Sequence, residues 1–467
     1  MALVRVGVFA AMVVALLAVF AVEPRTESLI YACCVFLLAQ FVWSLATWRA
    51  VRGTLFDPYA LALVAAFLFN AGQAFLQVFH LNEGGMLSGL FEAEQVLRTL
   101  ILVIAGLAAF HCGALMAATA QRKKAGRASA TGPSDDDVRL IGWILLVGSL
   151  IPAFILLRGA IGVVMSEGYF GLYRIAVPRG LGLAPQAVAT FLVPSALFVL
   201  VGGNGRRLDT VVSAVVIAVY ALVQFFLGSR GPATMSLVAF LWVWHRRIRR
   251  LPLVPILVGA ALLLFVVFPT ISVTRGLSGG ERLSAQFLAE SLFTVRNPAV
   301  ATLSEMGLTM ATVAHTLNLV PALRDFDRGA GYYYAARGIL PNLLFGPDRE
   351  YLFYGNWLVW TTEPTLAALG GGRGFSFIAE AYANFGWFGA PIALGLIGFL
   401  VARLFLWGDR PDRPARIALT GSFMCFFFIY ARGESGSLVR YLVWYGVIPY
   451  LATYGVMLLR RRISARG

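Results

Sequence analysis

Apolar residues occur in about twelve runs along this chain, most of them long enough to cross a membrane. A helix needs roughly 20 apolar residues to cross about 30 Å of hydrocarbon. The pattern therefore predicts an all-α polytopic integral membrane protein, with residues 1–467 in a single membrane domain of about 12 transmembrane helices. The predicted spans are 4–22, 29–47, 58–79, 97–119, 140–157, 187–202, 210–227, 232–245, 253–269, 386–406, 416–431 and 441–459.

Basic residues lie in alternate connections between these runs and predict their orientation. Cytoplasmic loops of membrane proteins carry an excess of arginine and lysine. With the N-terminus in the cytoplasm, six basic segments fall on that side, including a basic cytoplasmic loop at 120–139 and the C-terminal RRRISARG. Both termini are then cytoplasmic. A large extracytoplasmic segment, 270–385, lies between spans 9 and 10, and the first apolar run is expected to be a retained helix rather than a cleaved signal peptide.

Composition supports a membrane protein over a set of soluble domains. Hydrophobic residues make up 59% of the chain and charged residues 13%, against roughly 25% charged in soluble domains. The net charge of +15 is almost entirely arginine, since only Lys123 and Lys124 are lysines; a GC-rich genome would explain the same bias. All four cysteines lie inside apolar runs, which favours packing over a disulfide framework or a zinc site.

Three arginines depart from the positive-inside pattern. Arg230, Arg432 and Arg440 lie in short connections on the predicted outer side. An arginine beside lipid is costly unless it has an anionic partner. That partner is either an internal carboxylate, such as Glu434, or an anionic ligand.

The outer segment 270–385 is too apolar and aromatic to be a disordered linker. Helical spacing predicts one helix over 279–295 and a second over 297–320, opened by Asn297-Pro298 and closed before Pro321. The stretch 329–389 is dense in Tyr, Trp, Arg and Gly. Such a composition suits sugar rings, and it equally suits the headgroup zone of a bilayer.

The sharpest local signal is GGGRGFSFIAEAYANFGWFG at 370–389. A helix that begins near Ser376 would place Glu380, Asn384 and Trp387 on one face. Glu380 would then serve the chemistry or pair with one of the outer arginines.

This stretch, with SEMGLTMATVAHTLNLVP, GILPNLL and LGSRGPATMSLVAFLWVW, resembles the O-antigen polymerase (Wzy-type) oligosaccharide repeat unit polymerases from about residue 140 onward. The resemblance implies a GT-C-like architecture, shared with the O-antigen ligases, in the bacterial inner membrane. It implies transfer of a growing glycan from undecaprenyl diphosphate to a sugar hydroxyl of the next lipid-linked unit, on the periplasmic side.

The resemblance implies neither a nucleotide sugar nor a cofactor, and the outer segments contain no D-x-D pair or His/Cys cluster that would suggest a metal. Expected partners are undecaprenyl-diphosphate-linked oligosaccharides and membrane lipids, with a chain-length regulator protein as a further candidate and no nucleic acid. An O-antigen ligase, or a transporter or flippase of lipid-linked sugars, remains the alternative.

The transfer requires groups for a diphosphate, a hydroxyl and sugars. Arginine's planar fork holds a diphosphate without a metal, and a carboxylate or histidine can accept the hydroxyl proton. The candidates for diphosphate binding are Arg230, Arg432 and Arg440, followed by Arg373, Arg275 and Arg337. The candidate bases are Glu380, then Glu434, Glu305 and His315. The candidate sugar-binding residues include Tyr382, Asn384, Tyr334 and Trp360.

Overall fold

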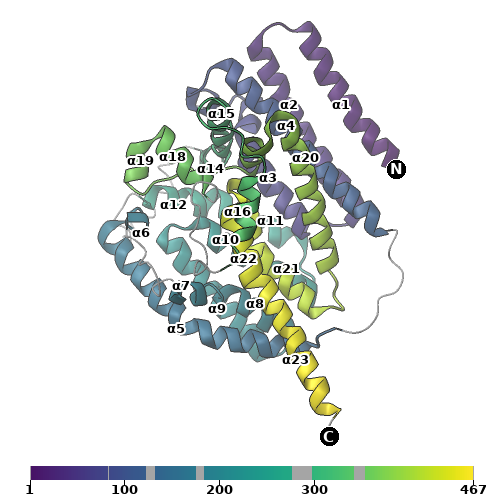
Figure 1. Ribbon diagram of the computed structural model, residues 1–467, viewed down its shortest axis with the longest axis vertical. Coiled ribbons are helices and arrows are strands. Elements are labelled where there is room, and N and C mark those ends of the chain that lie inside the picture. Colours follow the sequence, from purple (N-terminus) through teal and green to yellow (C-terminus); the bar gives the residue numbers. More distant parts are fainter. Residues whose placement is uncertain are drawn as a thin grey trace.

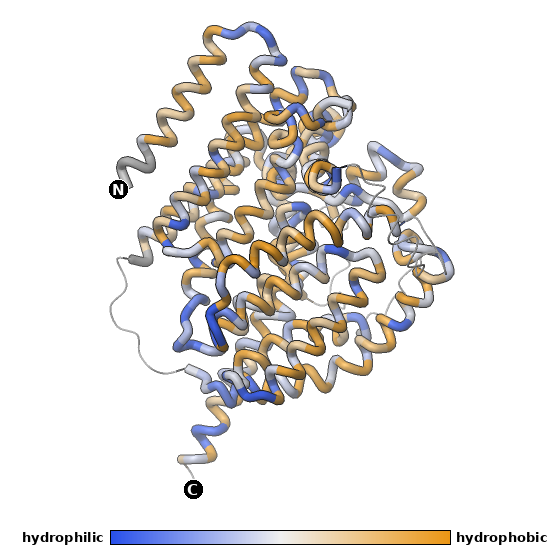
Figure 2. Tube along the Cα trace, turned by 180° about the vertical axis from the view of Figure 1, so that it is seen from behind, coloured by the Kyte–Doolittle hydropathy of each residue, from blue (hydrophilic) through white to orange (hydrophobic). Residues whose placement is uncertain are grey.

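The computed structural model describes residues 2–82, 84–122, 132–174, 184–275, 297–340 and 353–465, and contains no strand within these ranges. Long apolar helices pack side by side (Figure 1). Most residues along these helices are hydrophobic, and hydrophilic residues lie mainly at the helix ends and in the loops (Figure 2). The long elements are α1 (Ala2–Val22), α2 (Thr26–Arg52), α3 (Pro58–Val78), α4 (Ala93–Arg122), α5 (Asp135–Glu167), α8 (Leu192–Gly203), α9 (Arg207–Leu227), α10 (Arg230–Arg247), α11 (Leu253–Leu262) continuing through η3 (Leu263–Val267) into α12 (Phe268–Thr274), α20 (Phe377–Gly408), α21 (Pro414–Phe427) continuing into η5 (Phe428–Arg432), and α22 (Ser435–Leu442) continuing through η6 (Val443–Val447) into α23 (Ile448–Ser464).

Ten helices in the described ranges are long and apolar enough to cross a membrane. The chain is therefore a polytopic membrane protein, as the sequence predicted. The expected spans 4–22 and 232–245 are helical as α1 and α10 but are not among these ten. In α1 the described apolar part is only Gly7–Val22. In α10 the helix begins with Arg230 and ends in His245, Arg246 and Arg247, so its apolar stretch is short.

Close packing of α4 against α20 sets the position of α20. A Cβ on Gly113 would lie 1.9 Å from the carbonyl oxygen of Gly395, and a Cβ on Gly398 would lie 1.9 Å from that of Phe110. Only glycine permits this approach, as in other membrane helix pairs that pack through small residues. The N-terminal end of α20, where Glu380 lies, is thereby held against the bundle.

A charged network joins helix ends at the opposite side of the bundle. Arg52 donates to Asp57 at 2.9 Å and also pairs with Asp409, which in turn pairs with Arg246. These residues connect the end of α2, the start of α3, the end of α10 and the connection between α20 and α21. Because buried charges are stable only when paired, the network fixes these helices relative to one another.

Short helices cover the side of the bundle away from this network. They are η1 (Met86–Gly89), α6 (Gly171–Arg174), α14 (Pro298–Gly307), α15 (Thr309–Leu319), α16 (Ala330–Arg337), α18 (Tyr354–Thr362) and α19 (Pro364–Ala368). The short helix α7 (Ala184–Ala189) instead leads into α8, and together they form the span Pro185–Gly203. The predicted helix over 297–320 is two helices, α14 and α15, that meet at Leu308; the Asn297 side chain caps α14 by accepting from the N–H of Val300. The helix predicted over 279–295 lies outside the described residues.

The helix predicted from Ser376 is present, and the Ser376 side chain caps it by accepting from the N–H of Ile378. The expectation that Trp387 shares a face with Glu380 and Asn384 is wrong. Gly386 has a φ of 66° and a ψ of −164°, which interrupts the helix before Trp387. Mainly glycine adopts this conformation, so the presence of Gly386 explains why the helix is interrupted there.

Candidate active site

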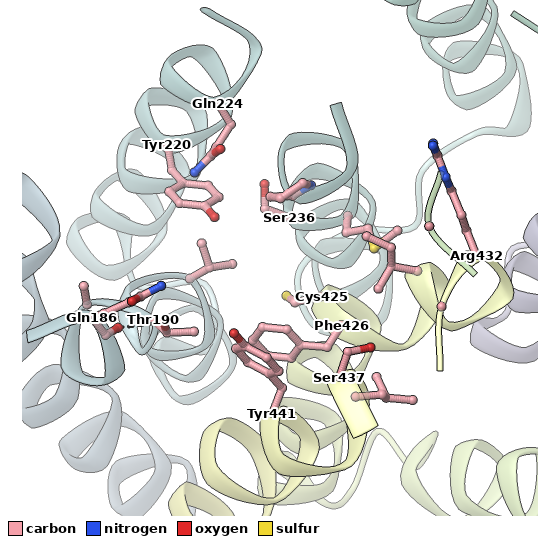
Figure 3. Close-up of a pocket in the computed structure, with 18 of the residues that line it drawn as sticks. Gln186, Thr190, Tyr220, Gln224, Ser236, Cys425, Phe426, Arg432, Ser437 and Tyr441 are labelled. Carbon is pink, nitrogen blue, oxygen red and sulfur yellow. Dashed lines mark hydrogen bonds between the residues drawn. The ribbon is translucent and has the colours of Figure 1, made fainter. Parts of the chain in front are cut away.

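A cavity of about 640 Å³ opens between the long helices and the connecting segments around Gly355 and Gly372. Its walls come from α5, the 185–203 span, α9, α10, α21 and α22 (Figure 3). At one end it is lined by the backbone of Gly355, Gly372 and Gly374 and by the turn Arg432-Gly433-Glu434. A ligand can approach the backbone closely here, because three of these wall positions are glycine and carry no side chain.

Arg432 is available to a ligand in this cavity. Its guanidinium has no hydrogen-bond or ion-pair partner among the residues that the structure describes, although the side chain is half-buried. Its backbone is held by a hydrogen bond of 3.2 Å from the N–H of Phe375 to the Arg432 carbonyl oxygen. An immobilised arginine with unused donors is a site for an anion.

Two more predicted arginines gather around one carboxylate beside Arg432. Glu305 of α14 pairs with Arg230 at the start of α10 and, at 3.4 Å, with Arg275. Ser272 donates a further hydrogen bond of 2.8 Å to Glu305. Glu305, Arg230 and Arg275 all lie close enough to act electrostatically on the Arg432 guanidinium. The sequence placed these four groups in separate segments, and the fold brings them together.

The cluster carries an excess of positive charge. Three guanidinium groups and one carboxylate leave a net charge of +2. Burial and the nearby charge of Arg230 lower the pKa of Arg275, which indicates crowding of like charge. Burial opposes the ionisation of Glu305, but its bonds to Arg230 and Ser272 hold its pKa below the ordinary value. Glu305 is therefore a stable anion that offsets part of the arginine charge.

Glu434 lines the same cavity one residue beyond Gly433. Its side chain is buried, with 8% of the residue exposed. Burial, and then the negative charge of Glu380, raise the pKa of Glu434 to about 8, while the backbone N–H of Gly355 acts in the opposite direction. A carboxyl group with a pKa in this range can exchange a proton near neutral pH.

Glu380 lies behind this turn and does not line the cavity. It is completely buried, at 0% exposure. Both of its oxygens accept from the backbone N–H of Ser435 at 3.0 Å, and one also accepts from the Ser435 hydroxyl at 3.0 Å and the Tyr430 hydroxyl at 3.2 Å. Its geometry is that of a group that fixes the turn, whereas Glu434 is the one that faces the cavity.

The other walls of the cavity are apolar or polar without charge. Side chains of α5, α8 and α10 form the apolar part, among them Leu156, Leu157, Val193 and Met235. The uncharged polar residues are Asn356 and, labelled around the cavity in Figure 3, Gln186, Thr190, Tyr220, Gln224, Ser236, Ser437 and Tyr441.

Sequence reasoning missed these polar residues because each lies in or next to an apolar run. One signal was available: Gln186 and Thr190, and likewise Tyr220 and Gln224, are four residues apart, so each pair faces one side of its helix. Polar groups within membrane helices usually face the protein interior and mark functional cavities.

Of the six predicted arginines, only Arg432 lines the cavity. Arg230 and Arg275 lie beside it in the cluster around Glu305, and the other three have neighbours elsewhere. Arg373 forms a double ion pair with Glu363 of the outer segment, one bond of which is 3.0 Å. The Arg440 guanidinium lies over the Trp444 ring at 5.7 Å. The Arg337 guanidinium lies over the ring of Tyr334, a predicted sugar-binding residue, at 5.5 Å. In each case the fold supplies an internal neighbour.

His315, the remaining candidate base, also lies away from the cavity. Its ring packs edge-on against Phe91 at 4.8 Å. Burial, and then the charge of Arg373, lower the pKa of His315, with Glu363 acting in the opposite direction. It is a neutral, packed side chain.

The predicted sugar-binding residues are distributed over other surfaces. The Tyr382 hydroxyl donates to the carbonyl of Val320 at 3.2 Å and the residue is buried. Asn384 is buried and bonded to the Tyr354 hydroxyl at 3.1 Å and to the N–H of Gly331 at 3.1 Å. Trp360 is 57% exposed on α18 and does not line the cavity.

Comparison with known proteins supports the resemblance seen in the sequence. No curated protein and no solved structure matches the chain. The family described as O-antigen polysaccharide polymerase Wzy matches residues 3–462, which is nearly the whole chain and includes both Arg230 and the turn at Arg432. The chain is a member of the O-antigen polysaccharide polymerase Wzy family.

Proposed function

We propose that this protein joins lipid-linked oligosaccharide repeat units into a polysaccharide at the periplasmic face of the bacterial inner membrane. The observation that supports this most directly is the pairing of Arg432 and Glu434 in one cavity, the first with no partner in the described part of the chain and the second buried. Transfer from a diphosphate to a hydroxyl needs an anion-binding group and a proton acceptor side by side.

The arginine cluster suits the leaving group. A diphosphate that links a sugar to a polyprenol carries two negative charges, and the cluster of Arg230, Arg275, Arg432 and Glu305 carries a net +2. As the sugar–oxygen bond breaks, negative charge grows on the diphosphate, and fixed guanidinium groups stabilise it. Metal independence is part of this proposal, because arginine forks supply the charge.

Glu434 is the proposed base. The acceptor hydroxyl oxygen forms a bond to the anomeric carbon of the donor sugar, and its proton passes to the Glu434 carboxylate. The bond from that carbon to the diphosphate breaks, and its electron pair leaves with the polyprenyl diphosphate. The Glu434 proton is then released to water, which restores the base.

The cavity walls suit the remaining parts of both substrates. The apolar side chains of α5, α8 and α10 offer a surface for the polyprenyl chain. The uncharged wall, which includes Tyr220, Gln224 and Tyr441, offers hydroxyl, amide and aromatic groups, the combination that suits a saccharide. We assign this wall to the sugar of the acceptor unit.

The orientation and partners follow the same proposal. The basic helix ends near Arg52 and Arg246 lie in the cytoplasm with both termini, and the arginine cluster lies at the periplasmic side. The partners are undecaprenyl-diphosphate-linked oligosaccharides, membrane lipids and, as a further candidate, a chain-length regulator.

Incubation of the purified protein with one defined undecaprenyl-diphosphate-linked repeat unit tests the proposal. A ladder of products that differ by one repeat unit, with release of undecaprenyl diphosphate, is the expected result. Transfer only onto a lipid A-core acceptor would identify a ligase instead. A folded protein that moves the intact lipid-linked unit across vesicles without forming a ladder would identify a transporter.

A further inference from the structure

The first turn of α22 is capped by a residue from another helix. Glu434 occupies the N-cap position, yet its own side chain makes no capping hydrogen bond. The backbone N–H of Ser435 instead points to Glu380 of α20, at 3.0 Å from each carboxylate oxygen. A side chain at the N-cap ordinarily accepts from the first turn of its helix, so Glu380 supplies what Glu434 does not.

Both carboxylate oxygens of Glu380 have hydrogen-bond donors. A buried carboxylate is stable only when its oxygens are hydrogen-bonded. At 0% exposure, Glu380 accepts from the Ser435 N–H and hydroxyl and from the Tyr430 hydroxyl. Tyr430 precedes Arg432 in the chain and Ser435 follows Glu434. The Glu380 carboxylate is therefore hydrogen-bonded to the turn on both sides of the two residues that line the cavity.

The second contact between these segments points the same way. The N–H of Phe375 donates to the Arg432 carbonyl oxygen at 3.2 Å, just before the helix that carries Glu380. The turn is thus fixed to α20 by backbone and side-chain bonds. Its Arg432 and Glu434 side chains are left for the cavity.

Glu380 and Glu434 are also neighbours electrostatically. The charge of Glu380 acts on Glu434, and both groups are buried. The other ionisable groups that face this pair are Tyr332 of α16, Tyr354 of α18, Tyr430 of η5 and Arg432 of the turn. The tyrosine hydroxyls are neutral, and the Arg432 guanidinium lies with Glu305, Arg230 and Arg275, so Glu380 is the negative neighbour of Glu434.

We infer that Glu380 is a positioning residue for the proposed reaction: it caps α22 in place of Glu434, leaves the Glu434 carboxylate to the cavity, and holds a negative charge beside it. This inference rests on the proposed role of Glu434 as the base. It assigns to Glu380 no contact with substrate.

Infrared titration tests the electrostatic part without requiring turnover. The protein in lipid nanodiscs is titrated with base while the carboxylic acid C=O bands are followed, and the band that is absent in Glu434→Gln belongs to Glu434. In Glu380→Gln the amide oxygen can still accept from Ser435, but the charge is gone. The Glu434 midpoint is expected to fall by about one pH unit or more. An unchanged midpoint overturns the inference even if the protein polymerises, and a shifted midpoint supports it even if it does not.

A kinetic measurement on Glu380→Asp tests the positioning role. Aspartate keeps the charge, but its side chain is too short to accept hydrogen bonds from both Ser435 and Tyr430. The expected result is a loss of about tenfold or more in kcat, with KM for the lipid-linked unit within about twofold of the wild-type value. A wild-type kcat overturns the inference. If Glu380→Gln cannot be purified folded, this variant carries the test.

Glu363→Gln is the matched control, because it makes the same chemical change at an outer ion pair away from the cavity. We expect it to leave both kcat and the Glu434 midpoint unchanged. If it folds while neither Glu380 variant does, Glu380 is a requirement of the fold and the inference is overturned.

Discussion

The N–H of Phe375 donates a hydrogen bond of 3.2 Å to the carbonyl oxygen of Arg432 and so joins two stretches more than fifty residues apart. Gly374 precedes this contact with a φ of 74°. A Cβ on Gly374 would lie 3.1 Å from both Cγ and Nε of Arg432. The glycine-rich stretch therefore determines where the Arg432 guanidinium lies in the cavity.

Gly374→Ala is expected to reduce polymer formation by about tenfold or more, because the new methyl group is strained at this φ and displaces Arg432. The measurement is the rate of ladder formation by purified protein at matched concentrations. Gly205→Ala is the control, since Gly205 has a φ of 88° but open space around its Cβ position. Equal losses in the two variants would mean that strain alone, and not the contact with Arg432, limits the activity.

Arg432→Lys is expected to lower kcat by about tenfold or more, because lysine keeps the charge and loses the fork that binds two diphosphate oxygens. Arg440→Lys is the comparison, since Arg440 lies over Trp444 and outside the cavity. It should retain most of the activity. If the two substitutions have the reverse order of effect, the diphosphate binds near Arg440 and the proposed site is misplaced.

The pH dependence of the reaction should follow Glu434, whose pKa burial and Glu380 raise from its ordinary 4.5 to about 8. A base works when deprotonated, so kcat should rise with pH to a plateau above about 8. The contribution of Glu434 to the free energy of unfolding should change in the opposite direction, because the folded state binds the proton more tightly than the unfolded state. This contribution is fully present below about pH 4.5 and is lost as the pH rises towards 8.

Glu434→Gln is expected to reduce kcat by about a hundredfold or more and to flatten the rising limb of the pH profile. The same variant should be more resistant to thermal unfolding than the wild type at pH 8, because it has no buried charge to form. A rising limb that survives in Glu434→Gln would assign the base to another group.

The helices could be predicted from the sequence because each must bury its backbone hydrogen bonds and cover about 30 Å of hydrocarbon with apolar side chains. Each of the twelve predicted spans falls on helix, although 187–202 is interrupted between α7 and α8, and ten helices in the described ranges are long and apolar enough to cross a membrane. The helix boundaries were less accessible. Leu308, which separates α14 from α15, carries no proline or glycine signal of its own, although Gly307 precedes it.

The arginine cluster was predictable in part, because a charge near the membrane requires a partner. That argument identified Arg230, Arg432 and Arg440, and the structure places the first two in one cluster with Arg275 and Glu305. It failed for Arg440, whose guanidinium lies over Trp444 and outside the cavity. Arg373, a further candidate, pairs with Glu363, because the sequence does not reveal which carboxylate the fold will bring close. The uncharged polar residues of the cavity wall carry no charge that would require a partner, so only the four-residue spacing of Gln186 and Thr190, and of Tyr220 and Gln224, could have indicated them.

Gln224→Leu and Tyr220→Phe test that wall. Both are expected to raise KM for the acceptor unit by several-fold, because each lost hydrogen bond to a saccharide is worth about 0.5–1.5 kcal/mol. Donor binding, measured by displacement with undecaprenyl diphosphate, should be unchanged. Tyr31→Phe, which removes a hydroxyl bonded to the Val78 carbonyl at 3.3 Å elsewhere in the bundle, is the control. If the substitutions weaken donor binding more than they raise KM for the acceptor, the uncharged wall binds the donor and not the acceptor sugar.

Gly398→Ala tests the packing that positions the site. Its Cβ would lie 1.9 Å from the Phe110 carbonyl oxygen, so α4 and α20 must separate. Separation removes dispersion contacts along the whole interface, and membrane helix pairs depend on those contacts because lipid offers no hydrophobic driving force between them. The variant is expected to unfold at a markedly lower temperature in nanodiscs, as measured by the loss of helical circular dichroism. Gly148→Ala on α5 has open space around its Cβ position and should change the unfolding temperature little. Equal stability of the two variants would mean that α4 and α20 are farther apart in the membrane than in this structure, and the position of Glu380 behind the Arg432 turn would have to be revised with them.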